Sequence, residues 1–356
     1  MKNENNYFIQ SNKMLLNVSA RSYERRKRTP ADIPESYMNK KSRMEENYIM
    51  TEKMFSERKK PWSGLGTVIE EATDSKTALE MSCLDWNVIQ KNIETSDGDI
   101  ITGYKANVRE TDNAVLGIVS DRYKVVQNMD AFSFTDALLG EGVRYEIAGS
   151  LQNGRRTWIL VRLPHQYIIN GDEITPYLIV MNSHDGSGSI KVAMTPVRVV
   201  CSNTLNFALA KAKRSWSMVH TGDISTKLDE AKNTLIYAGN YMAELGKNFA
   251  QLEKIKLSDS KILDFINELI PENEGITPQQ RRNILRLRED MKQRYFDAPD
   301  LMGTGKNAYR FINAVSDFAT HAKPLRERSN YRENLFAKTV DGNPMIDKAY
   351  QMVMAA

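Results

Sequence analysis

The polar segment NSHDGSGS, residues 182–189, contains the residue types that could do acid–base or hydrolytic chemistry. His184 and Asp185 are adjacent there, with serines nearby. A nucleophile, its base and a third, orienting group must meet in space, and adjacent residues of a strand point to opposite faces. His184 and Asp185 therefore form a catalytic pair only within a tight turn. The other interpretations are a hairpin loop, for which Asp185–Gly186 is a typical turn former, and a contact to nucleic acid.

A metal site is an alternative for the same segment. His184, Asp185 and His220 would supply three ligands and leave positions open, as catalytic metal sites do. His165 and His321 fit no ligand spacing, and the two cysteines form no C-x-x-C pair. The leading interpretation therefore includes no catalytic residue, no metal and no cofactor, and it places the chain in a reducing, cytoplasmic setting.

The segment GTGKNAYR, residues 303–310, has part of the pattern of a phosphate-binding loop. A Walker loop requires G-x-x-x-x-G-K-[ST] between a strand and a helix, whereas here Lys306 is followed by Asn307 and the flanks are helical. We interpret the segment as a glycine turn before a helix, in which backbone amides and Lys306 could still hold a phosphate.

Basic and aromatic residues recur between Arg122 and Trp216. Alternation along a strand allows one face to be apolar while the other presents cations. A cationic groove with aromatic side chains is the usual means of binding single-stranded nucleic acid. Tyr123, Trp158 or Trp216 could stack on bases, unless Trp158 belongs to the core and the arginines are solvated. The predicted interface comprises Arg155, Arg156, Trp158, Lys191, Arg198, Asn203, Lys211, Lys213 and Arg214.

Strands and helices that would position these residues can be read from the periodicity. Alternating apolar residues predict a hairpin around TDNA within 102–126, a second hairpin within 144–164, and two strands within 175–200. Asn153–Gly154 is the type I′ turn signal of the second hairpin. Helices are predicted at 75–85, at 128–140 with Asn128 as N-cap, at 202–216 with Ser202 or Asn203 as N-cap, and at 224–255, 277–296, 304–321 and 344–354.

These elements predict an α+β fold with an antiparallel sheet, flanking helices and a helical C-terminal region. We expect a basic N-terminal arm at 1–60, an α+β core domain at 61–222 and the helical region at 223–356. The arm has 14 Lys and Arg against 8 Asp and Glu, concentrated around RSYERRKRTP. Such a cluster attracts phosphates, although a solvated tail explains it equally well. No apolar stretch has the length needed to span a bilayer, and the polar N-terminus is no secretory signal.

The chain resembles a known family in several segments. PWSGLGTVIE, PYLIVMNSHDGSGS, TPVRVVCSNTLN and GTGKNAYRFINAVSDFATH occur in order from residue 61 onwards, and they are similar to the phage/plasmid-like protein family called domain of unknown function DUF932. The resemblance implies a home on phages, prophages or plasmids, and thus the cytoplasm of a bacterial host. It implies no reaction.

The order of helix, antiparallel meander and helix also resembles Rad52-like single-strand annealing proteins, in pattern alone. Together these observations predict a phage or plasmid DNA-metabolism protein that binds single-stranded DNA, anneals it in recombination and forms a homo-oligomer. One alternative is a metal-dependent hydrolase or nuclease that uses His184 and Asp185. Another is a protein-interaction factor that acts on host defence or replication.

Overall fold

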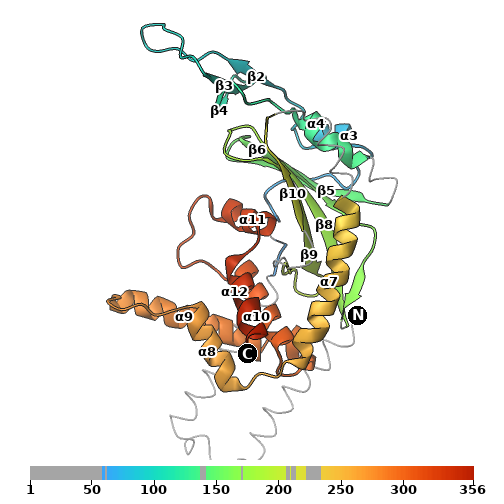
Figure 1. The fold of residues 1–356 in the computed structure, drawn as a ribbon, viewed down its shortest axis with the longest axis vertical. Coiled ribbons are helices and arrows are strands. Elements are labelled where there is room, and N and C mark those ends of the chain that lie inside the picture. The colour runs from blue at the N-terminus through green and yellow to red at the C-terminus, as the bar shows by residue number, and fades with distance from the viewer. Residues whose placement is uncertain are drawn as a thin grey trace, which may run out of the picture. The chain divides into compact units, whose positions relative to one another are not determined.

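The computed structural model describes residues 58–60, 62–136, 142–169, 171–205, 209, 214–221 and 234–356. The chain divides into two units, Met1–Ser56 and Glu57–Ala356. The second unit contains all of the described residues, and the predicted arm lies almost wholly outside them. Figure 1 shows the elements of this unit, which combine antiparallel sheets with a helical C-terminal region. The predicted α+β class is confirmed.

The main sheet is an antiparallel meander. Neighbouring strands of the sheet follow the order of the chain, apart from a short strand that pairs beside it, and the central strands are buried on both faces. The described strands run in the order β1 (Thr67–Val68), β5 (Arg144–Leu151), β6 (Arg156–Arg162), β8 (Asp172–Ser183), β9 (Ile190–Arg198) and β10 (Ser215–Met218), and β7 (Tyr167–Ile169) pairs with β8.

The predicted hairpin at 144–164 is the β5–β6 pair. Leu151 pairs with Arg156, so four residues form its turn rather than two. Gln152 and Asn153 both have positive φ, at 52° and 58°, and Gly154 follows with φ 90°. The amide of Arg155 donates to the carbonyl of Gln152 at 3.4 Å, so Asn153 and Gly154 are the central residues of the turn. Both have the positive φ that a type I′ turn requires, as predicted.

A second, three-stranded sheet corresponds to the hairpin predicted around TDNA. It consists of β2 (Val88–Lys91), β3 (Tyr104–Arg109) and β4 (Val115–Ser120), all antiparallel. We call residues 88–120 the finger, because Figure 1 shows them projecting from one end of the main sheet. The β2–β3 connection is the tip of the finger.

The helix predicted at 128–140 starts as expected. α4 (Asn128–Phe132) continues as the 3₁₀ turn η2 (Ser133–Thr135), and residues 137–140 lie outside the described set. Its N-cap is Gln127, so the prediction of Asn128 in that role is wrong. The Asn128 side chain instead donates to the carbonyl of Leu84, because it belongs to a buried network described below. α3 (Ser75–Met81) precedes it in the chain.

The predicted helices beyond residue 222 are present where the chain is described. α9 begins after Thr277, which forms a capping box with Gln280. Asn307 caps α10 by accepting from the amide of Arg310, so GTGKNAYR is a glycine turn before a helix, as predicted. The elements are α7 (Thr234–Lys254), α8 (Asp259–Leu269), α9 (Pro278–Phe296), η3 (Pro299–Thr304), α10 (Ala308–His321), α11 (Tyr331–Asp341) and α12 (Pro344–Met354).

α11 covers one face of the main sheet. Phe336 and Val340 are fully buried in a cluster with side chains of β6, β8 and β9. The Trp158 and Phe336 rings are 4.5 Å apart, and Trp158 has no exposed surface. Burial of an aromatic ring removes 150–250 Å² from water, so Trp158 contributes to stability as a core residue. Within the described residues, no helix combines the length and the apolar composition that crossing a bilayer requires.

The prediction of a helix at 202–216 is wrong for the residues of this range that the structure describes. Ser202 has a positive φ of 55°, Thr204 bridges to Val197, and Trp216 pairs with Val192 as part of β10. Residues 215–218 form a strand despite the amphipathic pattern, because β9 has an edge whose backbone groups need hydrogen-bond partners. Residues 206–208 and 210–213, including Lys211 and Lys213, lie outside the described set.

Candidate nucleic-acid interface

The segment 182–189 joins the finger to the main sheet. His184 is fully buried at the end of β8, and its Nε2 lies 2.9 Å from Asn128 Oδ1. That oxygen also accepts from the Thr157 hydroxyl at 2.8 Å. On the finger side, Asn107 Nδ2 donates to the carbonyl of His184 at 2.8 Å. A buried polar network of this kind fixes the orientation of the elements that it connects.

The protonation of His184 follows from this network. Asn128 Oδ1 can only accept, so the proton of the neutral imidazole must be on Nε2. Burial, with a smaller contribution from His220, lowers the pKa of His184 to about 4, so the ring is neutral at pH 7. Because His184 is neutral, no charge is buried there. This is consistent with its role as a hydrogen-bond donor in the joint, the junction of the finger and the main sheet.

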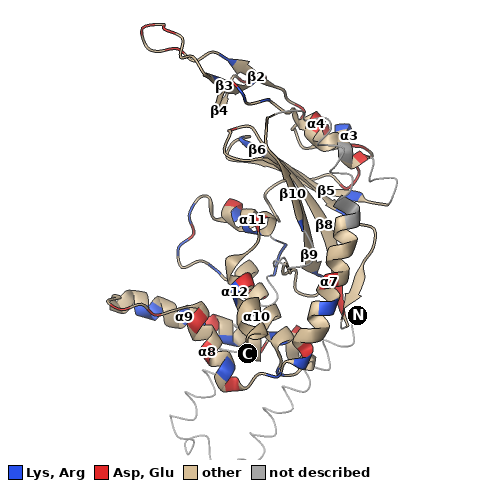
Figure 2. Cartoon of the chain, viewed as in Figure 1, with Lys and Arg blue, Asp and Glu red and all other residues tan. Residues whose placement is uncertain are grey.

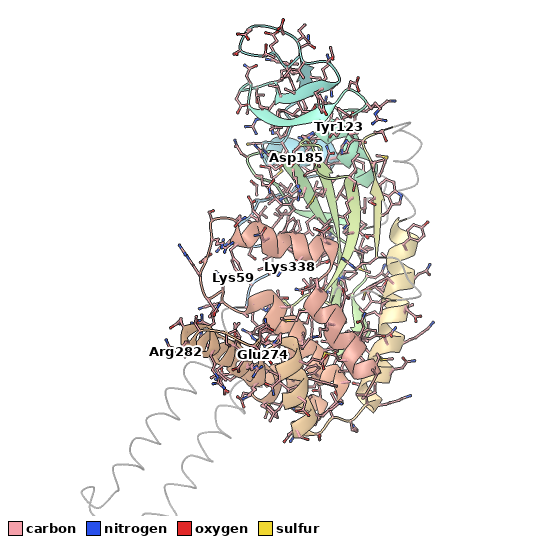
Figure 3. The ribbon with its side chains drawn as sticks, turned by 60° about the vertical axis from the view of Figure 1, so that its left-hand side comes forward. Lys59, Tyr123, Asp185, Glu274, Arg282 and Lys338 are labelled. Atoms are coloured by element: carbon pink, nitrogen blue, oxygen red, sulfur yellow. The ribbon has the colours of Figure 1, made fainter. Side chains whose placement is uncertain are left out.

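Asp185 has different partners from His184. Its Oδ1 accepts from the Ser183 hydroxyl at 2.7 Å and from the amide and hydroxyl of Ser187 at 2.9 and 2.7 Å. Burial alone would raise its pKa, but these hydrogen bonds lower it below the usual value. Figure 3 shows Asp185 and Tyr123 at the junction of the finger and the main sheet. The described contacts therefore divide His184 and Asp185 between two separate sets of partners.

Tyr123 completes the joint. Its hydroxyl donates to the carbonyl of Ser183 at 2.6 Å, and its ring stacks on His220 with centroids 4.6 Å apart. Gly117 of β4 lies so close to the segment that a Cβ atom there would be 2.4 Å from Asp185 Cα. No group of three or more His, Cys, Asp and Glu side chains within the described ranges is arranged to hold a metal ion.

A second buried network joins the main sheet to the C-terminal helices. Arg198, at the end of β9, has a side chain that is 2% exposed. It contacts Asp172 of β8 at 2.6 Å and also pairs with Asp300 of η3. Tyr309 of α10 donates to Asp172 from the other side. A buried charge of this kind requires such partners, so Arg198 is committed to holding the sheet and the helices together.

The same network includes Arg58, at the N-terminal end of the described residues. Arg58 pairs with Asp300 and Asp317, each at 2.8 Å, and Arg294 of α9 contacts Asp317 at 2.7 Å. Burial would raise the pKa of Asp317, but the hydrogen bond with His321 and the charges of Arg294 and Arg58 lower it well below the usual range. Asp317 is therefore ionised, as the counter-charge to both arginines.

Asn203 and Cys201 lie beside this network. Asn203 is fully buried and contacts Cys201 Sγ and the carbonyl of Asn313. Burial raises the pKa of the Cys201 thiol to about 12, despite the opposing charge of Arg198. The segments TPVRVVCSNTLN and GTGKNAYRFINAVSDFATH thus meet here, which explains their polar character structurally.

Three other members of the predicted interface are also engaged. Trp158 is in the core, as described above. Lys191 pairs with Asp341 of α11 at 2.6 Å. Arg214 donates to the carbonyls of Met194 and Val340 at 2.9 and 2.8 Å, which satisfies a carbonyl in the last turn of α11. Of the predicted set, the exposed Arg155 and the half-buried Arg156 form no ion pair among the described residues. Arg156 donates to the Ser187 hydroxyl at 2.8 Å, and its charge helps to lower the pKa of Asp185.

Arg155 and Arg156 lie next to a basic segment that we had not singled out. Residues 322–332, AKPLRERSNYR, comprise the α10–α11 connection and the first two residues of α11, and they carry four basic side chains against Glu327 alone. Arg326, Arg328 and Arg332 are exposed and form no ion pair with another described residue. We call the following set the basic track: Lys59, Arg155, Arg156, Arg326, Arg328 and Arg332.

Three contacts bring the segments of the basic track together. The amide of Gln152, in the β5–β6 turn, donates to Glu333 at 3.1 Å. Arg332 Nη1 lies 2.8 Å from where a Cβ of Gly64 would be. The Lys59 carbonyl is 3.0 Å from His321 Nε2, and Figure 3 shows Lys59 near the α10–α11 connection. The track thus runs along one side of the unit from the turn to Lys59.

Aromatic rings lie beside the basic track. Trp86 is half-buried, and its ring is 3.4 Å from the Cβ position of Gly154, in the β5–β6 turn. The Arg109 guanidinium lies 5.3 Å from the centroid of the same ring. At the other segment, the half-buried Tyr331 donates to the carbonyl of Ala322 at 3.1 Å. Cations with partly exposed rings beside them can bind phosphates and stack on bases.

The comparisons with known proteins identify one family model. The model described as "Domain of unknown function (DUF932)" matches residues 115–339. This range includes both buried networks in large part and most of the basic track. No curated protein and no solved structure matches the chain.

Proposed function

The chain belongs to the DUF932 family, and we propose that it binds single-stranded DNA along the basic track, as a DNA-metabolism protein of a phage or plasmid. The observation that carries the proposal is the convergence of three segments, distant in sequence, whose cations have no ion-pair partner among the described residues and, except for the half-buried Arg156, are exposed. Surface cations are usually offset by nearby carboxylates, whereas this set is available to phosphates.

The rigidity of the track supports the proposal. Its segments adjoin the two buried networks and the α11–sheet core, so the backbone positions that carry the cations are held before a ligand arrives. Binding to a preorganised surface costs less conformational entropy than binding to mobile side chains and loops. Arginine is also suited to phosphate because its planar guanidinium donates two parallel hydrogen bonds.

This surface suits a single strand better than a duplex, because it offers aromatic rings on which unpaired bases can stack. Trp86 and Tyr331 offer ring surface beside the cations, and stacking on aromatic side chains contributes about 1–3 kcal/mol per base. A strand held by its phosphates keeps its base edges accessible. That arrangement favours pairing with a complementary strand, so the proposal includes annealing in recombination.

The test is fluorescence anisotropy of a labelled oligonucleotide over a salt series. The track variant Arg326→Ala/Arg328→Ala/Arg332→Ala should bind single-stranded DNA more weakly. Each phosphate contact to a single strand contributes about 0.7 to the log–log salt slope, so the slope should fall by about 2. A gel assay of complementary strands should show slower annealing by the same variant.

A matched control removes the same charge elsewhere. Lys247, Lys254 and Lys256 are exposed on and after α7, and their triple alanine variant should retain the wild-type slope. Equal losses in the two variants would mean that net charge alone drives binding. Absence of wild-type binding at low salt would refute the proposal and direct attention to a protein partner.

A further inference from the structure

The finger has an outward face that is unusually apolar for a surface. Ala106 pairs with Ile118 across β3 and β4, and Tyr104 is two residues from Ala106, so Tyr104 and Ile118 share one face. The opposite face carries Asn107, which bonds to the joint. The exposed fractions on the finger are 40% for Ile101, 54% for Tyr104, 56% for Ile100, 57% for Val115 and 62% for Ile118. Such a concentration of exposed apolar side chains indicates an interaction surface.

The tip of the same finger is acidic. Glu94, Asp97 and Asp99 are exposed, and residues 92–103 include no Lys or Arg. None of the three carboxylates forms an ion pair with another described residue. Figure 2 shows these acidic residues along the tip and basic residues on the α10–α11 connection. The finger tip and the basic track are therefore complementary in charge.

We propose that the acidic finger tip of one copy of this chain docks on the basic track of a second copy. Carboxylates at the tip would pair with Arg326, Arg328 and Arg332. Ile100 and Ile101 would contact Leu325, which lies within the same basic segment and is 43% exposed. Arginine–carboxylate pairs reinforced by apolar burial are a common basis of protein interfaces, and complementary charges accelerate the encounter of the two surfaces.

The contact must form between copies. The finger is fixed at its base by Asn107 and Tyr123, through their hydrogen bonds to His184 and Ser183. Figure 1 shows the tip projecting away from α11, whose first turn carries Arg332 of the track. Because the two surfaces differ, the interface is heterologous, and repetition of it produces a ring or an open filament. Head-to-tail assembly is therefore the expected form of self-association.

Docking of the finger would compete with single-stranded DNA. Carboxylate and phosphate oxygens use the same guanidinium donors, so a track occupied by a finger cannot hold phosphates. This competition rests on the proposed function, whereas the self-association does not. Addition of single-stranded DNA should therefore dissociate the assembly, and self-association should in turn weaken the binding of DNA.

The first experiment measures mass by sedimentation velocity at low salt. The wild-type chain should self-associate, and the association should weaken as salt is added. The finger variant Glu94→Gln/Asp97→Asn/Asp99→Asn changes three exposed side chains to near-isosteric amides and should be monomeric. The track variant should also be monomeric, because each variant lacks one of the two surfaces.

An equimolar mixture of the two variants gives the decisive result. The track variant has an intact finger and the finger variant has an intact track, so the mixture should form a one-to-one dimer and nothing larger. A monomeric wild-type chain, a variant that still assembles, or a mixture that stays monomeric would each overturn the proposal.

The proposed function can fail separately. The finger variant keeps the basic track, so it should bind single-stranded DNA at least as tightly as the wild-type chain. If the mixture dimerises but no sample binds DNA, the self-association stands and the proposed function falls. If the finger variant binds DNA and still assembles like the wild-type chain, the docking proposal falls alone.

Discussion

The backbone amide of Gln152 donates to the carboxylate of Glu333, 181 residues later in the chain, at 3.1 Å. This hydrogen bond connects the β5–β6 turn to the first turn of α11. The burial of Phe336 against Trp158 holds the same two elements together. Arg155 and Arg332 therefore contribute cations to one side of the molecule, where a strand of nucleic acid could contact both.

The contribution of the turn can be measured with Arg155→Ala/Arg156→Ala. At about 0.7 per phosphate contact, the log–log salt slope for single-stranded DNA should fall by about 1.4 and the affinity should decrease. Lys247→Ala/Lys254→Ala is a control with the same charge change. An unaltered slope in a correctly folded Arg155/Arg156 variant would remove the turn from the interface.

The neutral His184 predicts acid sensitivity. Its pKa is about 4 in the folded chain, against about 6.5 when unfolded. Between these values the unfolded state binds more protons, so the free energy of unfolding decreases as the pH falls, by up to about 3 kcal/mol. Above pH 6.5 both states are neutral and the effect vanishes.

Urea denaturation at several pH values can test this with His184→Gln. The variant should show a smaller decrease in the free energy of unfolding between pH 6.5 and pH 4 than the wild-type chain. His165→Gln replaces an exposed histidine and should keep the wild-type dependence. A parallel pH dependence in His184→Gln and the wild-type chain would contradict the assignment.

Gly117→Ala probes the close approach of the finger to the main sheet. The new Cβ would be 2.4 Å from Asp185 Cα, so the backbone must shift, and overpacking of this kind costs about 1–3 kcal/mol. Gly239→Ala is the matched comparison, since nothing lies within 4 Å of its Cβ position in α7. It should stabilise the helix by about 1 kcal/mol. Thermal denaturation should shift in opposite directions for the two variants.

Asp317→Asn tests the second buried network. Removal of its charge leaves Arg58 and Arg294 without their shared counter-ion, and breaking a buried pair typically costs about 3–5 kcal/mol. Asp341→Asn, which removes the exposed partner of Lys191, should cost about 1 kcal/mol or less. Similar midpoints in urea for the two variants would show that the buried network contributes little.

The alternation of apolar residues was sufficient to predict the meander and the finger hairpin, since each strand has one or both faces buried. Helical periodicity likewise located α9, and the glycine turn in GTGKNAYR located the start of α10. The segment 202–216 has the composition of a helix, and only the free edge of β9 explains why residues 215–218 are a strand. That edge is a property of the folded sheet.

The interface residues show the same limit. Arg198 looks like a surface cation in sequence, but its partners Asp172 and Asp300 come from two other elements, and Asp300 is 102 residues away. The run of basic residues in 322–332 is visible in the sequence. Its proximity to Arg155 and Lys59 depends on tertiary packing, which no local pattern encodes.

The pairing of Arg58 with Asp300 and Asp317 also has a consequence for biosynthesis. The two carboxylates follow Arg58 by 242 and 259 residues. On the ribosome, the strands of the main sheet emerge well before them, so a nascent chain can form the meander while Arg58 lacks both carboxylates and Arg198 is paired with Asp172 but not with Asp300. The growing chain must keep these guanidinium groups hydrated until η3 and α10 have been translated. Closure of the unit is therefore a late event, and a product truncated before residue 300 should remain open and be a substrate for cellular proteases.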